Sequence, residues 1–343
     1  MLIDGISDEQ GNRLINLQTI ITSHSSHIVS ECDFDDIKYF KRSSNTEVVS
    51  QNLKELETRY KAEKDPERNH FKFLKQYLTL NYSEIFFADK AILFEGETEG
   101  ILLPAMLKKV DEEHPSENDL PLLSQNISLI ASGAYSQIFD EFLSFIGIKT
   151  LIITDIDSGK ESISKDKNGR DTKKIVACSI EEATHTTNGA LLHYFETPLS
   201  KSGAKEPISF FMTLAPENKI LQKNNRLWET NSNGNLMIAY QTKETGGYYP
   251  RSFEDAFFQI NRELVIQNKK LFPSLKCKEQ LDEKDADGHF IYDSYDLANN
   301  CIGSKASFAL DILLNSINDG KHTFSNWKMP PYIEEGLLWL RQN

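Results

Sequence analysis

From about residue 88 onward, short apolar runs alternate with longer stretches that carry apolar residues at helical spacing. Apolar runs of four or five residues are typical of strands buried on both faces, and the longer stretches are typical of amphipathic helices. We expect strands at 91–94, 127–130 and 150–154, a helix at about 98–110, and a helix at about 138–146 ending at Gly147. This βαβαβ order predicts an α/β fold, a parallel sheet flanked by helices.

The second half of the chain is less regular. The pattern predicts strands at about 191–196 and 236–240, a turn at 245–250, helices at about 252–267 and 304–316, and a C-terminal helix opened by Pro330 and Pro331. Residues 158–174, which are rich in lysine and contain glycine, are expected to form a surface loop. The C-terminal stretch adds a helical tail to the predicted sheet.

The first 87 residues have a different pattern. A short strand at 19–22, a helix beginning near Ser26 and a strand at 37–40 are expected, and residues 46–85 have the apolar stripes of helices. A first strand with nothing before it to pair with makes a poor domain. We therefore expect the chain to be the C-terminal part of a longer protein.

Composition narrows the possible classes of function. The chain has 343 residues and a net charge of −13, which argues against a general nucleic-acid coat, because phosphate binding normally uses Lys and Arg. Local basic patches still leave room for a nucleic-acid enzyme. The four cysteines are scattered without a CxxC motif, so neither a zinc site nor a disulfide framework is expected. The first residues lack the basic-then-apolar pattern typical of a signal peptide, and no apolar run approaches the roughly 18 residues that a membrane span needs, so we expect a cytoplasmic protein.

Two acidic motifs follow predicted strands. Glu95 and Glu99 lie in EGETE after the first strand, and Asp155 and Asp157 lie in DID after the third. The carboxyl ends of parallel strands meet at one edge of a sheet, so these acids are expected to converge, with Thr98 capping the helix between them. Clustered carboxylates repel one another unless a divalent cation is bound. Alternatively, the acids of EGETE only stabilise the N-terminus of a helix through its dipole, and DID is part of an ordinary loop.

Two later motifs contribute further candidates. In RSFED, Ser252 and Asp255 fit a capping box, whereas Glu254, or alternatively Asp255, could be a further metal ligand. In GSKASFA, Lys305 occupies the first turn of an apolar helix, where a cation is mildly unfavourable. It is either a solvated surface lysine or a functional one.

A histidine and a basic segment complete the candidates. His24 in SHSSH is either a polar residue before a helix or a histidine that senses a nucleotide phosphate. The basic loop after Asp157 is either solvated or grips a DNA backbone. Its candidate DNA-binding residues are Lys160, Lys165, Lys167, Arg170, Lys173 and Lys174.

Taken together, the EGETE and DID strands resemble a Toprim domain, the fold shared by topoisomerases and primases. More narrowly, the chain resembles the OLD (overcoming lysogenization defect) family of endonucleases, which includes the nuclease subunit of the Gabija anti-phage system. TIITSHSSHIV is similar to the switch-histidine segment of an ABC ATPase, and RSFED and GSKASFA match late motifs of the family. The resemblance covers about 16–45 and 88–315. No GxxxxGK[ST] motif occurs, so the resemblance implies a missing ATPase half, without which His24 would bind no ATP.

The resemblance implies a nuclease with two divalent cations, Mg²⁺ or Mn²⁺, among Glu95, Glu99, Asp155, Asp157 and Glu254. One cation would activate a water for attack on a DNA phosphodiester, and the other would stabilise the leaving oxygen. Glu95 and Lys305 would be catalytic, and Lys305 would either neutralise the charge of the phosphorane or assist the proton transfers.

The alternatives are another Toprim phosphotransfer enzyme (a primase-like polymerase or an RNA nuclease) and a non-catalytic assembly module. Expected partners are DNA, further copies of the chain, and an ATPase or helicase-like protein. The expected organisation is an ATPase remnant (1–45), a helical linker (46–87), the Toprim domain (88–320) and a helical tail (321–343).

Overall fold

The computed structural model describes Gln10 and residues 20–42, 46–61, 70–165, 167, 170–244 and 246–342. Its strands are β1 (Lys38–Arg42), β2 (Val48–Asn52), β3 (Lys90–Phe94), β4 (Ile127–Ala131), β5 (Lys149–Ile153), β6 (Ser158–Lys165), β7 (Asp171–Ala177), β8 (His185–Thr186), β9 (Ile220–Asn224), β10 (Leu227–Thr230) and β11 (Leu236–Ala239). Its helices are α1 (Ser26–Glu31), α2 (Leu53–Lys61), α3 (His70–Asn81), α4 (Glu97–Glu113), α5 (Asp140–Ile146), α6 (Gly189–Tyr194), α7 (Glu196–Ser202), α8 (Pro207–Thr213), α9 (Phe253–Gln267), α10 (Ser294–Cys301), α11 (Lys305–Leu314) and α12 (Pro331–Arg341).

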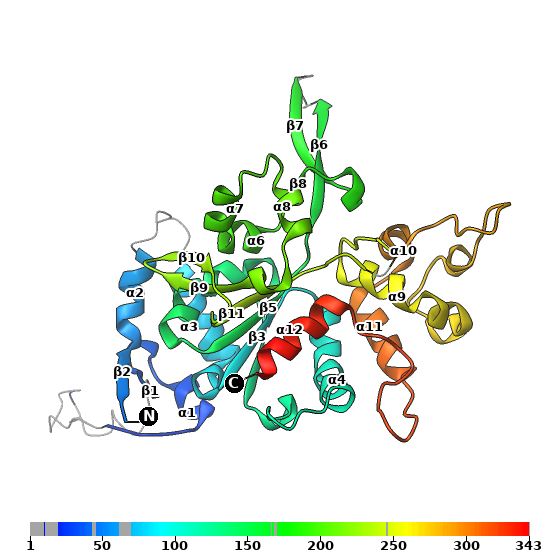
Figure 1. Ribbon diagram of the computed structural model, residues 1–343. Helices are drawn as coiled ribbons and strands as arrows, with labels where there is room; N and C mark the ends of the chain where they lie inside the picture. The colour runs from blue at the N-terminus through cyan, green and yellow to red at the C-terminus, as the bar shows by residue number, and fades with distance from the viewer. Residues whose placement is uncertain are drawn as a thin grey trace.

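A six-stranded sheet in the order β10-β9-β11-β5-β3-β4 forms the centre of the fold (Figure 1). The strands β11, β5, β3 and β4 run parallel, and β9 and β10 add an antiparallel edge. Phe94 of β3 lies opposite Ile153 of β5, which in turn lies opposite Ala239 of β11. The carboxyl ends of three neighbouring strands are therefore level with one another. This shared edge positions the candidate site.

Both faces of the sheet are covered, because successive residues of its strands point to opposite sides. On one face, Ile92, Leu151 and Met237 pack in a core with helices α4, α9, α11 and α12. On the other face, Leu93 and Ile152 pack in a second core with α2, α3, α5 and α6. The apolar runs are continuous in sequence because each strand has an apolar neighbour on both sides.

Helix α12 lies against one face of the sheet and is tied to the starts of two strands (Figure 1). A Cβ atom on Gly336 would lie 2.8 Å from Leu151 and 3.2 Å from Ala239, so glycine allows the helix to approach the sheet closely. The ammonium group of Lys90, which is buried, donates to the carbonyl oxygens of Leu340 (2.6 Å) and Arg341 (3.1 Å). These bonds satisfy carbonyls at the end of the helix that have no partner within it.

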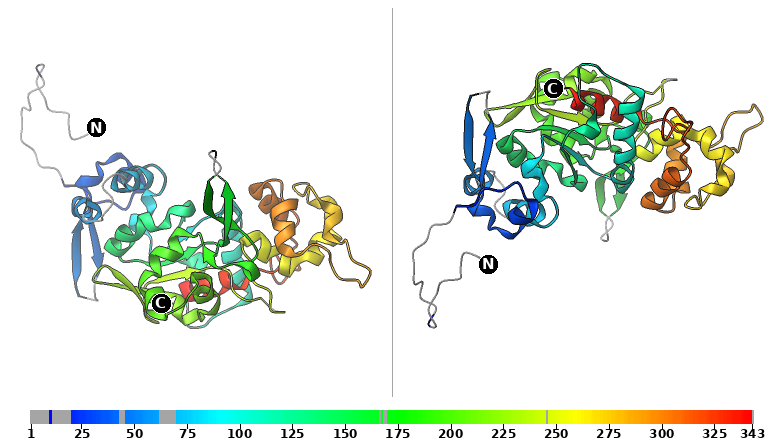
Figure 2. Two further views of the ribbon diagram at one scale, coloured as in Figure 1. Left: turned by 90° about the horizontal axis from the view of Figure 1, so that it is seen from above. Right: turned by 90° about the horizontal axis from the view of Figure 1, so that it is seen from below.

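Two hairpins extend from the body of the molecule (Figure 2). The β1–β2 hairpin lies on the N-terminal side, and the β6–β7 hairpin rises from the carboxyl edge of the sheet. The strand β8 pairs with the base of β6, where Ser158 lies opposite Thr186. Residues 159–185 therefore leave the body and return to it at neighbouring backbone positions.

The predicted α/β architecture with a parallel, helix-flanked sheet is confirmed, as are its strands and helices between 88 and 154. Gly147 ends α5 in the left-handed conformation, at φ 62°. The strand at 236–240, the turn at 246–250 and the helices after 252 are also confirmed, whereas α4 runs three residues beyond the predicted end, to Glu113.

Three predicted elements are wrong. Residues 158–165 and 171–174 belong to the paired strands β6 and β7 and not to a loop, and residues 166, 168 and 169 lie outside the described residues. The mainly polar residues of these strands fit a ribbon with both faces open to solvent. Residues 191–196 are helical and not a strand, because the Asn188 side chain caps α6. Residues 20–22 form no strand, and Thr19 lies outside the described residues.

The predicted boundary between residues 45 and 46 falls within the connection of the β1–β2 hairpin. The next segment begins with β2 and continues with α2 and α3, whose residues Leu56 and Leu74 are buried in the same core as Leu93 of the sheet. The domain limits stay a prediction. No helix in the described part of the chain is long and apolar enough to cross a membrane.

Replacing Lys90 with Met keeps most of the apolar stem but removes the ammonium group. We expect this change to lower the free energy of unfolding by about 2 kcal/mol, because charged hydrogen bonds to the end of α12 are lost. Urea titration followed by circular dichroism measures this difference. Lys108→Met, on the exposed side of α4, is the control and should change stability by less than about 0.5 kcal/mol. Equal stability of the two variants would contradict the proposed role of Lys90.

Candidate metal centre

Three neighbouring strands carry polar side chains past the carboxyl edge of the sheet. Glu95 directly follows β3, Asp155 lies two residues after β5, and Gln241 lies two residues after β11. The pairing of these strands places Asp155 level with Gln241, and both lie one residue further along than Glu95. The predicted convergence of the EGETE and DID motifs therefore rests on the register of a buried parallel sheet.

Glu99 reaches this edge from the first turn of α4. The helix begins at Glu97, after Gly96, so Thr98 lies inside the helix and the prediction that it caps the helix is wrong. A Cβ atom on Gly96 would lie 2.1 Å from the nearer carboxylate oxygen of Glu99. A larger residue at position 96 would therefore displace the Glu99 carboxylate, which folds back over the backbone at the end of β3.

Helix α9 contributes Glu254. The Ser252 hydroxyl caps this helix by accepting from the Asp255 amide (3.4 Å), as the capping box predicts. The buried Glu254 carboxylate accepts from the Thr98 hydroxyl (2.7 Å). Asp255 is turned away and accepts from the Tyr248 hydroxyl (2.8 Å), so Glu254 is the member of this motif that faces the other acids.

Lys305 lies at the start of α11, which the Ser304 hydroxyl caps. Its ammonium nitrogen is 2.9 Å from Oε2 of Glu254, although 52% of the lysine side chain is exposed. The interaction with the acids accounts for a cation in the first turn of a helix, where the helix dipole disfavours it.

Asp157 is held by backbone geometry and by an arginine. Its φ of 47° lies in the left-handed region, which residues other than glycine seldom adopt. Its carboxylate accepts from the Arg251 guanidinium (3.0 Å), and Arg251 also donates to the carbonyl oxygen of Ser158 (3.2 Å). Arg251 stands in the RSFED motif, but the sequence did not indicate this role.

Two side-chain amides that the sequence did not single out also contact the acids. Gln241 donates to Oδ1 of Asp155 (2.5 Å), and Asn188 donates to Oε2 of Glu95 (3.2 Å). The Thr154 hydroxyl donates to the same Glu95 oxygen. Gln241 could have been found by applying the rule used for the acids, since it directly follows a predicted strand, 236–240. Asn188 gave no comparable signal, because its neighbours were assigned to the wrong element.

Burial and mutual repulsion raise the proton affinity of several of these acids. Burial and the neighbouring Glu254 raise the pKa of Glu99 to about 7. Burial, Glu99 and Glu254 raise the pKa of Asp155 well above its usual range. Burial also raises the pKa of Asp157, against the effect of Arg251. For Lys305, burial lowers the pKa, but Glu254 and Asp155 together raise it above its usual value.

The donor set fits a hard divalent cation. All five predicted ligands supply carboxylate oxygens, the donors that Mg²⁺ and Mn²⁺ prefer. Burial and neighbouring carboxylates raise the pKa values of Glu99 and Asp155, and a bound cation would favour their ionised forms. Glu95, Glu99, Asp155, Asp157 and Glu254 would hold the ions. Their contacts with Lys305 and Arg251 offset part of the repulsion.

Other candidate residues lie apart from this edge. His24 contacts the ring of Phe87, which precedes β3, whereas the acids follow the opposite end of that strand. Across the described residues, three potential ligand atoms lie within 4.8 Å of one another only at Glu113, His114 and Glu334. The sheet-edge acids are thus spread more widely than this surface group, in which Glu113 is already paired with Lys109 and His114 with Glu334.

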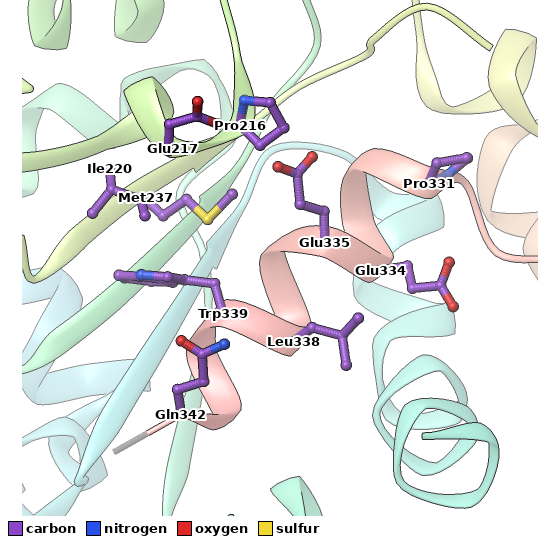
Figure 3. A pocket seen from close by; sticks show the side chains of 10 residues that line it. All are labelled: Pro216, Glu217, Ile220, Met237, Pro331, Glu334, Glu335, Leu338, Trp339 and Gln342. Carbon is purple, nitrogen blue, oxygen red and sulfur yellow. The ribbon is translucent and has the colours of Figure 1, made fainter. Parts of the chain in front are cut away.

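A cavity of about 400 Å³ runs along α12 (Figure 3). Met237, Glu335 and Trp339 contribute to its lining, and none of the five acids does. The predicted DNA-binding residues lie on the β6–β7 hairpin and its connection, where Lys160 is paired with Glu182 and Lys173 with Glu161.

The raised pKa of Glu99 predicts a pH-dependent effect of Glu99→Gln. The pKa of Glu99 is 4.5 in the unfolded chain and about 7 in the folded protein, so between these pH values Glu99 is protonated mainly in the folded state. The contribution of Glu99 to stability therefore falls as pH rises through this window. Glutamine cannot ionise. In EDTA, we expect Glu99→Gln to gain on the order of 2 kcal/mol over the unchanged protein between pH 5 and pH 8, measured by urea unfolding.

Glu97→Gln is the matched control, because Glu97 lies in the same turn of α4 but is exposed. Its stability relative to the unchanged protein should vary little over the same pH range. A pH-independent difference for Glu99→Gln would show that Glu99 carries no such penalty.

Comparisons with known proteins agree with this geometry. Residues 86–157 match the family model described as the Toprim domain of overcoming-lysogenization-defect-like proteins. The chain is 29% identical over 340 residues to Endonuclease GajA of Bacillus cereus (strain HuB5-5), covering 96% of this chain and 43% of that protein. It thus spans less than half the length of this relative.

The C-terminal region of the Xanthomonas campestris pv. campestris OLD protein aligns in three dimensions over 75% of this chain and 94% of that chain, with a TM-score of 0.35 and 13% identity. The matched family segment, residues 86–157, contains β3, α4 and β5 together with four of the five sheet-edge acids. The segment that carries these four acids is thus similar to the Toprim domain of OLD-like proteins.

Proposed function

We propose that this chain is a divalent-metal-dependent endonuclease that cuts DNA phosphodiester bonds at the carboxyl edge of its sheet. The observation that carries the proposal is the group of five acids at the sheet edge, in which Lys305 contacts Glu254, and burial and repulsion raise the pKa values of Glu99, Asp155 and Asp157. The similarity to Endonuclease GajA supports the same reaction. Folding alone does not require so many carboxylates in one place, because their repulsion is destabilising.

The proposed roles follow from the contacts. Divalent cations held by the acids would supply a nucleophile at neutral pH and stabilise the leaving oxygen, by the two-metal chemistry of many nucleases. Lys305 is half-exposed and touches the cluster, so its ammonium group can also approach the scissile phosphate. There it would neutralise the charge that develops in the transition state. Arg251 would keep Asp157 ionised and oriented.

We further propose that the β6–β7 hairpin contacts the DNA backbone. The hairpin begins one residue after Asp157, and residues 158–177 contain six basic and three acidic residues. Lys165 and Lys174 are exposed, and no ion pair joins either of them to an acid in the described residues. They are therefore better placed than Lys160 or Lys173 to meet phosphates.

The partners belong to the same proposal. Assembly with further copies of the chain, with an ATPase half or with a helicase-like protein, and a role in anti-phage defence, rest on the family resemblance. His24 would sense a nucleotide only as part of a complete ATPase.

Glu95→Gln and Lys305→Met should each reduce plasmid cleavage by about 100-fold or more, because each removes a charge from the reacting centre. The assay follows supercoiled plasmid with Mg²⁺, with Mn²⁺ and with EDTA, and EDTA should abolish cleavage. Glu97→Gln and Lys270→Met change exposed residues outside the cluster and should cleave normally. Metal-dependent cleavage that persists in Glu95→Gln would exclude this site.

The double variant Lys165→Ala/Lys174→Ala tests the hairpin. In a Glu95→Gln background, which prevents cleavage, we expect weaker duplex binding and a slope of log affinity against log salt that is smaller by about 2, since each lost phosphate contact contributes about 0.9. Fluorescence anisotropy over a salt series measures both quantities. Lys321→Ala/Lys328→Ala, two exposed lysines outside the hairpin, is the control. Equal slopes for the two double variants would remove the hairpin from the DNA interface.

A further inference from the structure

Gln241 is a buried amide whose orientation is fixed by a backbone donor. Its Oε1 accepts from the Ile156 amide (2.7 Å), and its exposed fraction is only 1%. A backbone N–H can only donate, so the oxygen of Gln241 must face Ile156 and its NH₂ group must face the other way. That NH₂ group lies 2.5 Å from Oδ1 of Asp155 and 3.2 Å from the Tyr332 hydroxyl.

Asn188, the residue before helix α6, repeats this arrangement. Its Oδ1 accepts from the Leu191 amide (2.9 Å), as the cap of α6, so its NH₂ group must face the sheet edge. There it donates to Oε2 of Glu95 (3.2 Å), to the Thr154 hydroxyl (2.6 Å) and to the carbonyl oxygen of Asp155 (2.8 Å). Asn188 is 4% exposed.

Each amide engages one oxygen of a predicted ligand. Oδ1 of Asp155 accepts from Gln241 and from the Phe253 amide (3.0 Å), and the described residues give its Oδ2 no hydrogen bond. Oε2 of Glu95 accepts from Asn188 and Thr154, and the described residues likewise give its Oε1 none. A carboxylate fixed through one oxygen presents the other in a defined direction, and a donor to a carboxylate favours its ionised form.

We propose that Asn188 and Gln241 are positioning residues that hold Glu95 and Asp155 in the orientation required to bind divalent cations. This inference rests on the proposed metal site and assigns to it residues outside the Glu, Asp and Lys motifs. Both amides act through the carboxylates and do not touch the metal. Partners of metal ligands typically contribute 10- to 100-fold to metal affinity.

The test uses Asn188→Asp and Gln241→Glu. Each change preserves the shape and the oxygen that accepts from Leu191 or Ile156, but replaces the NH₂ donor with an oxygen. Asn188→Ser and Gln241→Met remove the donor without adding charge, and serine still caps a helix. Mn²⁺ affinity, measured by isothermal titration calorimetry on the full chain, should fall at least about 10-fold in all four variants.

The matched control is Asn261→Asp, another change of a buried asparagine, 4% exposed, whose amide contacts the backbone of Lys328 and not the acids. It should lower stability but leave Mn²⁺ affinity within about 2-fold. Folding of every variant is checked by circular dichroism. Unchanged or tighter Mn²⁺ binding in the folded Asn188 and Gln241 variants would overturn the inference. Failure of the unchanged protein to bind Mn²⁺ would instead overturn the proposed metal site.

Discussion

Repulsion among carboxylates at one edge of a buried sheet is the constraint on which the other features of this molecule depend. The strands β3 and β5 deliver Glu95 and Asp155 to neighbouring positions, and α4 and α9 add Glu99 and Glu254. Burial weakens the screening by water, so the acids raise one another's pKa values. Positive charges and hydrogen-bond donors offset part of that repulsion. They come from Lys305, Arg251 and the side-chain amides of Asn188 and Gln241.

The helices on the two faces of the sheet contribute different residues to the acid cluster and its surroundings. One core contains the helices α4, α9 and α11, whose first turns carry Glu99, Glu254 and Lys305. The opposite core contains α6, whose cap is Asn188. The acids are therefore held from both sides, and the packing of distant apolar residues determines the positions of charged atoms. Glu99, Glu254 and Lys305 belong to separate helices that pack closely in one core, which restricts their movement relative to one another.

The sequence predicted the features that depend on local pattern. Buried strands and helix starts leave clear signals, and the acids at their ends could be identified together with Lys305. The supporting residues could not be identified so readily. Asn188 and Thr154 contact each other across 34 residues, so no spacing along the chain indicates this pair. Gln241 does follow a predicted strand, but it lacks the negative charge that distinguishes the acids at the other strand ends. The β6–β7 hairpin was missed because both its faces meet solvent, which removes the alternation of apolar and polar residues that marks a half-buried strand.

The β6–β7 hairpin is closed at its base by the pairing of β6 with β8, and this affects how related proteins can differ in length. The segment leaves after Asp157 and returns before Asn188, and Ser158 and Thr186 pair at its base. Residues can therefore be gained or lost at the tip without shifting either side chain at the sheet edge. Under the proposed function, the length of the hairpin, and with it its reach along bound DNA, could change without altering the acids at the sheet edge.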